Sequence, residues 1–246
     1  MDYNINDFTE THYRQLLRLA KNHYQFLRYG EDTASPKVLW RHDIDFSVHR
    51  ALRLAEIEAE EEVTSTVFVL PHSSFYNILE KPVFERLKQI QQLGHELALH
   101  FDASFYGYFN SQAEPEEKMR AEKMLLENVF DQPIRVVSYH NPDVSNVLQF
   151  EAFLLAGMIN TYGADFKTNW GYCSDSNGYW RFKRLHDVLE SLEYEQLQVL
   201  THPVWWQETA MLPRERIERC TQGRADYCLS GYDSDMKAVG RTNIGA

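Results

Sequence analysis

The sequence is poor in cysteine and in basic residues, and each shortage excludes a class of protein. The three cysteines among 246 residues are Cys173, Cys220 and Cys228, and no two of them form a CxxC pair. This argues against both a disulfide framework and a thiolate zinc site. Lys and Arg number 25 against 36 Asp and Glu, for a net charge of -11. Without a basic surface for phosphate backbones, we expect no nucleic-acid partner.

Targeting and membrane signals are also missing from the sequence. The first fifteen residues, MDYNINDFTETHYRQ, lack the basic n-region and the apolar h-region of a signal peptide. No uninterrupted apolar run approaches the length of a transmembrane segment. No fixed-period repeat, low-complexity tract or Pro/Gly/Ser linker divides the chain. We therefore expect a cytoplasmic protein that folds as a single domain over residues 1–246.

Strand-like and helix-like patterns alternate along most of the chain. Strands are predicted at residues 37–43, 64–70, 95–101, 134–139 and 197–202, and helices at 47–62, 83–93, 114–130 and 146–157. Strands that alternate with helices of this length imply right-handed βαβ units and a parallel sheet. A leading segment, residues 1–30, contains a helix predicted at 11–29, and residues 207–246 form a C-terminal extension. Residues 163–185 show no sustained period and are predicted to be one long irregular connection.

Four of the predicted strands run into titratable residues at their carboxyl ends. These residues are Asp43 and Asp45 after the first strand, His100 and Asp102 after the third, and His140 and His202 after the last two. In parallel α/β sheets and barrels the carboxyl ends of the strands lie on one face, which carries the active site. We therefore expect the four clusters to converge.

The residue types at these strand ends are suited to a metal ion. Carboxylate and imidazole ligands without thiolates fit a catalytic zinc or a similar divalent ion with an open position for water. Asp43 and Asp45 are two residues apart, so they share a face if the strand end is extended. One could then bind the ion while the other accepts a proton from the bound water. A bound cation would also relieve the repulsion between the two carboxylates.

Each of these residues also has a purely structural interpretation. Asp45 could cap the helix that follows it. His42 and His95 are interpreted as packed or hydrogen-bonded supports rather than ligands. Trp205 and Trp206 could be core residues or could stack on sugar rings, and the sequence does not separate the two. The functional interpretation is favoured because unrelated caps and core histidines have no reason to collect at the same end of four strands.

Four segments, RHDID, GHELALH, SYHNP and VLTHPVWW, resemble in their order and placement the polysaccharide deacetylase superfamily. The resemblance is to its divergent members associated with surface-polysaccharide biosynthesis, and it covers residues 37 to 206. It implies a distorted (β/α)₇ barrel. It also implies a hydrolase that depends on a divalent metal ion, with zinc as the expected ion, and that removes N-acetyl or O-acetyl groups from carbohydrates.

The resemblance assigns roles to individual residues. It implies that Asp43 is the catalytic base, that Asp45 and His100 bind the metal, and that His202 is the general acid. The two aspartates are adjacent in the family, whereas Ile44 separates them here, so the reverse assignment of base and ligand stays open.

Two departures from the family pattern concern the remaining metal ligand. The family has a second histidine four residues after the first, where this sequence has Ser104. It has an arginine that orients the catalytic aspartate where this sequence has His140. We therefore expect His140 to be the third ligand, with Asp102 as the second choice. The alternative is that His140 only hydrogen-bonds Asp43 and replaces the orienting arginine.

The substrate-binding residues are predicted from the surrounding segments. The segment SDSNGYWR is a candidate for the loop that positions catalytic residues. The candidate substrate-binding residues are Asp102, Asp175, Trp180, Arg181, Trp205 and Trp206. The expected substrate is a carbohydrate or a sugar-derived small molecule. Two rivals remain: an amidohydrolase of a small nitrogenous metabolite on the same barrel, and a non-catalytic barrel that binds a sugar or a protein partner.

Overall fold

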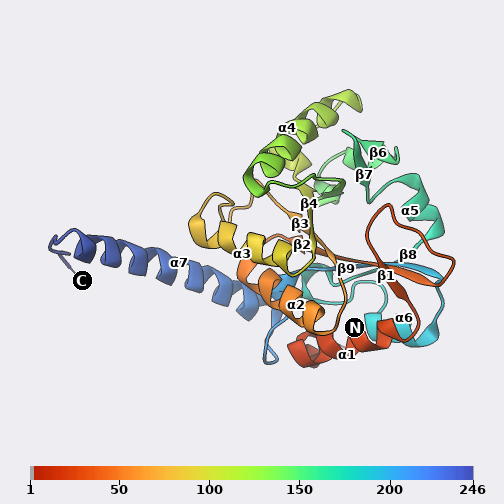
Figure 1. The fold of residues 1–246 in the computed structure, drawn as a ribbon, viewed down its shortest axis with the longest axis horizontal. Helices are drawn as coiled ribbons and strands as arrows, with labels where there is room; N and C mark the ends of the chain where they lie inside the picture. The colour runs from red at the N-terminus through yellow and green to blue at the C-terminus, as the bar shows by residue number, and fades with distance from the viewer. Residues whose placement is uncertain (1–2, 246) are drawn as a thin grey trace.

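The computed structural model describes residues 3–245 and is built around one mixed β-sheet (Figure 1). Its strands are β1 (Gln25–Leu27), β2 (Lys37–Ile44), β3 (Thr66–Val69), β4 (Glu96–Phe101), β5 (Val136–Tyr139), β6 (Leu154–Leu155), β7 (Met158–Asn160), β8 (Gly171–Ser174) and β9 (Gln196–Thr201). Its helices are α1 (Glu10–Lys21), α2 (Val48–Glu60), α3 (Lys81–Gln92), α4 (Ala113–Phe130), α5 (Ala164–Asn169), α6 (Leu185–Ser191) and α7 (Pro213–Ala238).

The sheet confirms the predicted fold class. Its order is β6-β7-β5-β4-β3-β2-β9-β8, with β1 added to β2. Every pairing is parallel except that of β6 with β7. The parallel strands from β7 to β8 therefore form a seven-stranded series. The sheet curls, but within residues 3–245 β8 does not pair with β7, so the barrel is open and distorted.

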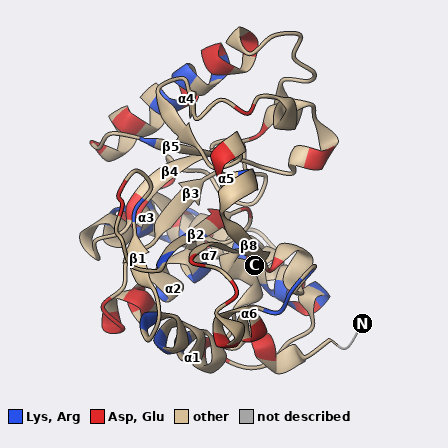
Figure 2. Ribbon diagram, turned by 90° about the vertical axis from the view of Figure 1, so that its right-hand side faces the viewer, with Lys and Arg blue, Asp and Glu red and all other residues tan. Residues whose placement is uncertain are grey.

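Helices and strands form where local chemistry favours them. Ser47 caps α2, because its hydroxyl accepts a hydrogen bond from the Arg50 backbone N–H at 3.2 Å. The inner face of α2 buries Ala51, Leu54 and Ala55 against the sheet. All of β3 is buried, as expected for a parallel strand covered on both faces. Acidic and basic residues are interspersed along α4 in Figure 2, as on a solvated helix.

The leading helix is shorter than predicted. The helical pattern was expected to run to residue 29, but α1 ends at Lys21. Residues Gln25–Leu27 instead form β1, which pairs with Lys37–Leu39 of β2. The prediction was wrong because a short strand that gains its hydrogen bonds from a distant partner carries little periodic signal of its own.

The prediction of a helix at residues 146–157 is also wrong. This segment forms the short 3-10 turn Val147–Gln149 and then the hairpin of β6 and β7. The hairpin turns at Ala156 and Gly157, which have φ values of 50° and 75°. Two successive residues in the left-handed region end a right-handed helix and reverse the chain.

The connection at residues 163–185 contains structure that the prediction missed. It forms α5 and strand β8, which lies beside β9 in parallel register. The strand begins at Gly171, where an added Cβ would lie 2.2 Å from the ring of Tyr194. Only glycine allows this close approach, so the strand depends on a contact that its own sequence does not reveal.

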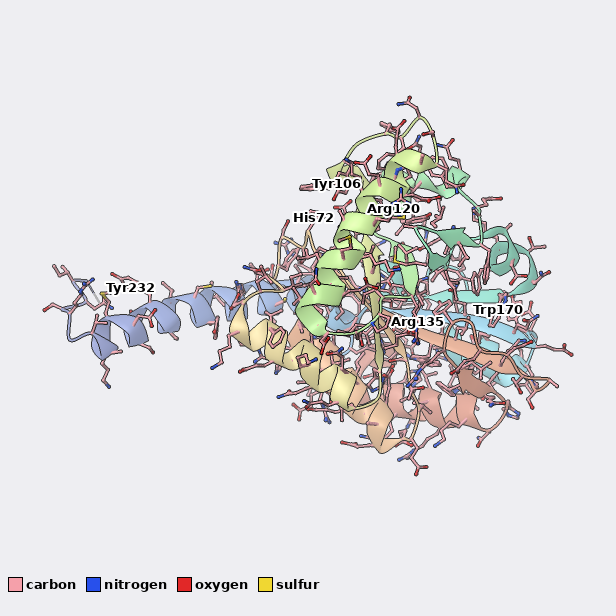
Figure 3. All side chains as sticks on the ribbon, turned by 45° about the horizontal axis from the view of Figure 1, so that its top comes forward. His72, Tyr106, Arg120, Arg135, Trp170 and Tyr232 are labelled. Carbon is pink, nitrogen blue, oxygen red and sulfur yellow. The ribbon has the colours of Figure 1, made fainter. Side chains whose placement is uncertain are left out.

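Most of the C-terminal extension is helix α7, which projects away from the body in Figure 1. Arg216, in its second turn, is buried, whereas nearly all residues from 221 onwards are exposed. Figure 3 shows Tyr232 far out along this helix. None of the described helices has the length and apolar character that crossing a membrane requires.

Candidate active site

The carboxyl ends of β2, β4, β5 and β9 converge on Asp45, as the sequence predicted. Asp45 Oδ1 lies 3.0 Å from His100 Nε2 and 3.2 Å from His140 Nδ1. Its other oxygen, Oδ2, lies 3.8 Å from His202 Nε2. The parallel arrangement explains this convergence, because these strands all end at the same edge of the sheet.

Three of these residues form a group that could hold a metal ion. Asp45, His100 and His140 each offer one ligand atom, and these atoms all lie within 4.8 Å of one another. One carboxylate and two imidazoles match the donor set of a catalytic zinc, which leaves a position open for water. The residues present therefore fit a divalent ion of this kind.

Asp102 lies outside this group of three. Its Oδ1 accepts hydrogen bonds from the backbone N–H and the hydroxyl of Ser104, at 2.9 Å and 2.6 Å. It thus caps the short 3-10 turn Ala103–Phe105. His140, and not Asp102, joins Asp45 and His100 in the group of possible ligands.

Both imidazoles in the group are held by a second contact. His100 Nδ1 lies 2.7 Å from the Ser138 hydroxyl, its register partner on β5. His140 Nε2 lies 2.9 Å from the side-chain amide of Asn141. Contacts of this kind fix ring orientation at metal sites. The sequence analysis missed Ser138, whose one signal is a hydroxyl within an otherwise apolar strand.

Asp45 is held in its charged form. Burial would raise its pKa, but hydrogen bonds from His100 and His140 and the nearby charge of His202 hold that pKa well below its usual range. Burial would lower the pKa of His140, yet its contact with Asp45 raises it. A cation bound here would therefore compete with the proton that Asp45 favours on His140.

Asp43 is paired with an arginine of its own strand. Arg41 Nη2 donates to Asp43 Oδ2 at 2.8 Å, and both side chains are buried. The alternative that His140 hydrogen-bonds Asp43 is therefore wrong. His140 contacts Asp45, and the residue that hydrogen-bonds Asp43 is Arg41. The second oxygen, Asp43 Oδ1, is buried without a hydrogen-bond partner. An unpaired carboxylate oxygen beside the metal-ligand group is suited to accept a proton.

His202 is fixed from behind by a buried aspartate. Its Nδ1 lies 2.7 Å from Asp175 Oδ1, and the indole of Trp206 donates to Asp175 Oδ2 at 2.8 Å. Burial opposes protonation, but the hydrogen bond and charge of Asp175 raise the pKa of His202 to about 9. This shift favours the protonated form of His202 at neutral pH.

Two predicted substrate-binding residues turn out to support His202 instead. Asp175 and Trp206 are both fully buried, at 0% exposure. A buried carboxylate with both oxygens occupied cannot bind a substrate, and a buried indole cannot stack on a sugar ring. Both residues lie near the site, as expected. Asp175 contacts His202 and Trp206, however, and neither Asp175 nor Trp206 lines the cavity.

A cavity of about 750 Å³ opens over these residues. Its wall includes Asp43, Asp45, His72, His100, Asp102, Tyr139, His140, Tyr162, Tyr172, Arg181, Phe182, His202 and Trp205. Of the predicted substrate-binding residues, Asp102, Arg181 and Trp205 line it. Trp180 does not, because it packs against Phe8 and Trp206. The sequence analysis missed Phe182, which is 71% exposed.

His42 and His95 are hydrogen-bonded supports, as predicted. His42 Nε2 lies 2.6 Å from Glu58 Oε1, and the Ser65 hydroxyl donates to Glu58 Oε2 at 2.7 Å. His95 Nε2 lies 3.0 Å from the Ala55 carbonyl. Burial would raise the pKa of Glu58, but His42 and His95 lower it to about 2. The network joins α2 to β2, β3 and the start of β4 behind the site.

No family model matches the sequence, and no curated protein matches it either. Solved structures with a similar chain course include a CE4 family pseudoenzyme from Bacillus anthracis, at 15% identity over 78% of this chain and 63% of that one, with a TM-score of 0.44. A second is a family 4 acetyl xylan esterase from Clostridium thermocellum, in complex with a cobalt ion, at 11% identity over 76% and 84%, with a TM-score of 0.47. A third is a peptidoglycan deacetylase from Bdellovibrio bacteriovorus, at 20% identity over 82% and 53%, with a TM-score of 0.45.

This chain thus spans less than two thirds of the length of the first and third of these proteins. All three identities are below 25% and all three TM-scores are below 0.5. The likeness to these structures is therefore one of fold alone.

Proposed function

We propose that this chain is a metal-dependent hydrolase of the polysaccharide deacetylase type, which removes an acyl group, N-acetyl in the first instance, from a carbohydrate or a sugar precursor. One observation carries the proposal. The ligand atoms of Asp45, His100 and His140 lie within 4.8 Å of one another. Asp43 Oδ2 lies 3.7 Å from His100 Nε2, and His202 Nε2 lies 3.8 Å from Asp45 Oδ2. The motif resemblance of RHDID, GHELALH, SYHNP and VLTHPVWW supports the same reaction class.

In this proposal Asp45, His100 and His140 hold the ion. A bound divalent ion would polarise the acyl oxygen and lower the pKa of water towards neutrality. Zinc is the first choice because the donor set is one carboxylate and two imidazoles.

Asp43 and His202 share the proton transfers. Asp43 Oδ1 has no other partner and accepts the proton of the attacking water, while Arg41 keeps Oδ2 occupied. His202 donates from Nε2 to the leaving amine, because Asp175 holds Nδ1. The water oxygen bonds to the acyl carbon, the carbon–nitrogen bond breaks, and the nitrogen leaves with the proton from His202. The raised pKa of His202, about 9, supports this role.

A carbohydrate substrate is supported by the character of the cavity. Its volume of about 750 Å³ lies in the ordinary range for a small-molecule site. Polar groups line it together with the exposed ring of Phe182, whereas Trp205, which also lines it, is only 6% exposed. Aromatic faces beside polar groups suit a sugar, which has both apolar ring faces and hydroxyl edges.

The test is acetate release by the full chain, first stripped with a chelator and then reconstituted with zinc. N-acetylglucosamine oligomers and acetylated xylan are offered as substrates, with Asp43→Asn as the inactive control. We expect zinc-dependent release that Asp43→Asn abolishes without losing the ion. Zinc-dependent hydrolysis of small cyclic or linear amides, without acetate from any sugar, would favour the metabolite amidohydrolase. Failure to bind zinc stoichiometrically would favour a non-catalytic barrel.

A further inference from the structure

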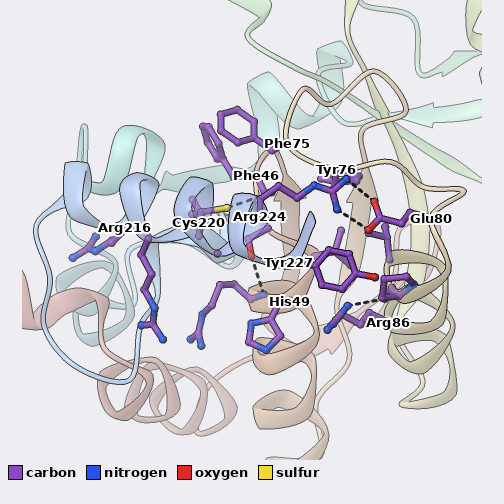
Figure 4. Close-up of a pocket in the computed structure, with 18 of the residues that line it drawn as sticks. Phe46, His49, Phe75, Tyr76, Glu80, Arg86, Arg216, Cys220, Arg224 and Tyr227 are labelled. Atoms are coloured by element: carbon purple, nitrogen blue, oxygen red, sulfur yellow. Dashed lines mark hydrogen bonds and ion pairs between the residues drawn. The ribbon is translucent and has the colours of Figure 1, made fainter. Parts of the chain in front are cut away.

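A second cavity, of about 400 Å³, lies where the root of α7 meets the body of the protein (Figure 4). Its wall combines the start of α2, the start of α3 and the inner face of α7. None of the proposed catalytic or metal-binding residues lines it. It touches the candidate active site only through Phe46 and Phe75, which line both cavities and whose ring centroids are 4.6 Å apart.

The floor of this second cavity is apolar. Phe46, Phe75, Val83, Val204 and the ring of Tyr227 contribute to its wall. Space of this size and lining can hold a short alkyl chain or a ring, because enclosing such a group removes apolar surface from water.

The edge of the same cavity is cationic. His49, Arg50, Arg86 and Arg219 line it from α2, α3 and α7. Burial lowers the pKa of His49, and the charges of Arg86, Arg50 and Arg219 lower it further, so all three guanidiniums lie close enough to act on one imidazole. This concentration of positive charge stands out in a chain of net charge -11.

Two of these arginines have no counter-ion within the described part of the chain. Arg86 donates only to the Pro82 carbonyl, at 2.9 Å. Arg219 donates to the Gln207 side chain at 2.8 Å and makes a long contact with the sulfur of Met211. Their charges are therefore available to a ligand.

The other charged groups of the cavity are already neutralised or turned away. Arg224 forms a two-pronged ion pair with Glu80, at 2.7 Å and 2.6 Å. Arg50 pairs with Glu10 at 2.6 Å. In Figure 4 the side chain of Arg216 lies away from Arg86, and it packs over Phe8. Glu80 is thus the one carboxylate in the wall, and its charge is balanced by Arg224.

We propose that this cavity binds an organic anion in which an apolar chain or ring carries a phosphate, sulfate or carboxylate group. The apolar part packs against Phe46, Phe75 and Val83, and the anionic group reaches Arg86 and Arg219. Guanidinium groups favour such oxyanions because they present paired N–H donors with a fixed charge. The site is independent of the hydrolase proposal, since it uses none of the same polar residues.

The test is calorimetric titration of the full chain with octyl phosphate, kept below its micelle concentration. Octanol, octylammonium and inorganic phosphate are titrated in parallel to separate the apolar and the charged contributions. We expect one molecule of octyl phosphate to bind, more tightly than any of the other three. Arg86→Gln with Arg219→Gln should weaken binding by about tenfold or more, because hydrogen bonds to charged groups are lost.

Two matched controls make the experiment specific. Gly223 lines the cavity and an added Cβ there meets nothing within 4 Å, so Gly223→Trp can fill the space. Gly231 lies on the same helix, is equally unobstructed and is outside the cavity, so Gly231→Trp should leave binding unchanged. Arg135→Gln with Arg241→Gln removes the same charge from exposed positions elsewhere and should also leave it unchanged.

Several outcomes would overturn the proposal. They are no binding of octyl phosphate, equal binding of octanol or octylammonium, and equal losses in the Arg86/Arg219 and Arg135/Arg241 pairs. Binding that appears only with vesicles of anionic lipid, and not with the monomeric probe, would also overturn it. If Gly223→Trp unfolds the protein, as judged by its thermal transition, the two charge variants decide the result by themselves.

Discussion

Arg41 donates a hydrogen bond to Asp43 at 2.8 Å although both residues lie on strand β2 and both are buried. Residues two apart on a strand share a face, so the strand itself brings the cation to the carboxylate. The Arg41 guanidinium also lies 5.0 Å from the ring centre of Phe68 and 5.5 Å from that of Tyr162. The candidate base is therefore held by its own strand, where the deacetylase pattern places an arginine on a different one.

Arg41→Met should destabilise the protein by about 3 to 5 kcal/mol, because it leaves the Asp43 carboxylate buried without its counter-ion. The free energy of unfolding from urea titrations measures this. Adding Asp43→Asn to the same chain should recover part of the loss, since the uncompensated charge is then gone. Arg120→Met is the control, as Arg120 is exposed on α4 and pairs only with Glu116 at 3.3 Å. An equal loss in both single variants would contradict the prediction.

Zinc binding should depend on His140 and not on Asp102. We expect the His140→Ala variant to retain little or no zinc, because the substitution removes one of three protein ligands. Asp102→Ala and Ser104→Ala should keep the zinc, because neither residue belongs to the ligand group. Ser104 instead donates hydrogen bonds to Asp102. Metal content after dialysis against trace zinc measures all three variants side by side. Retention in His140→Ala with loss in Asp102→Ala would reverse the ranking.

Stability of the metal-free protein should fall at alkaline pH because of His202. Its folded pKa of about 9 is above its ordinary value of 6.5, so the folded state binds the proton more tightly. The resulting stabilisation is fully present below pH 6.5 and is lost as the pH rises through about 9. The loss should be on the order of 3 kcal/mol.

His202→Gln and Asp175→Asn should each remove most of this pH dependence. The first removes the titrating group, and the second removes the hydrogen bond that raises its pKa. Urea titrations from pH 6 to 10 in the presence of a chelator measure the slope. A wild-type slope that survives in both variants would show that other groups are responsible.

Glu58→Gln should destabilise the protein at neutral pH by about 3 to 5 kcal/mol, since a buried carboxylate contact to His42 is broken. The folded pKa of Glu58, about 2, is below its ordinary value of 4.5. The stabilisation is therefore present above pH 4.5 and is lost as the pH falls through about 2. Glu60→Gln, at a side chain that is 53% exposed, is the control and should cost less than about 1 kcal/mol. Similar losses in the two variants would mean that the buried network contributes little.

Much of the fold could be predicted because strand and helix periods are local properties of the chain. Strands β2, β3, β4, β5 and β9 lie within a few residues of their predicted positions. They pair in parallel, and parallel pairing brings their carboxyl ends to one edge of the sheet. The convergence of Asp45, His100, His140 and His202 was predictable for that reason.

The missed elements share a physical cause. Strands β1 and β8 and the hairpin of β6 and β7 are two to four residues long, so they offer no sustained period. Each is stabilised by pairing with a strand distant in the sequence or by a turn that needs positive φ. Tertiary contacts, rather than intrinsic preference, decide such segments.

The sequence by itself determined the chemistry available to this protein: carboxylates and imidazoles at the ends of parallel strands, without thiolates or a basic surface. Tertiary structure decided which of these groups touch. It paired Asp43 with Arg41, His140 with Asp45, and His202 with Asp175, which the sequence analysis had assigned to the substrate. Residue type is fixed in the chain, but a hydrogen bond depends on register and side-chain direction to within a fraction of an ångström. Only the assembled sheet sets those.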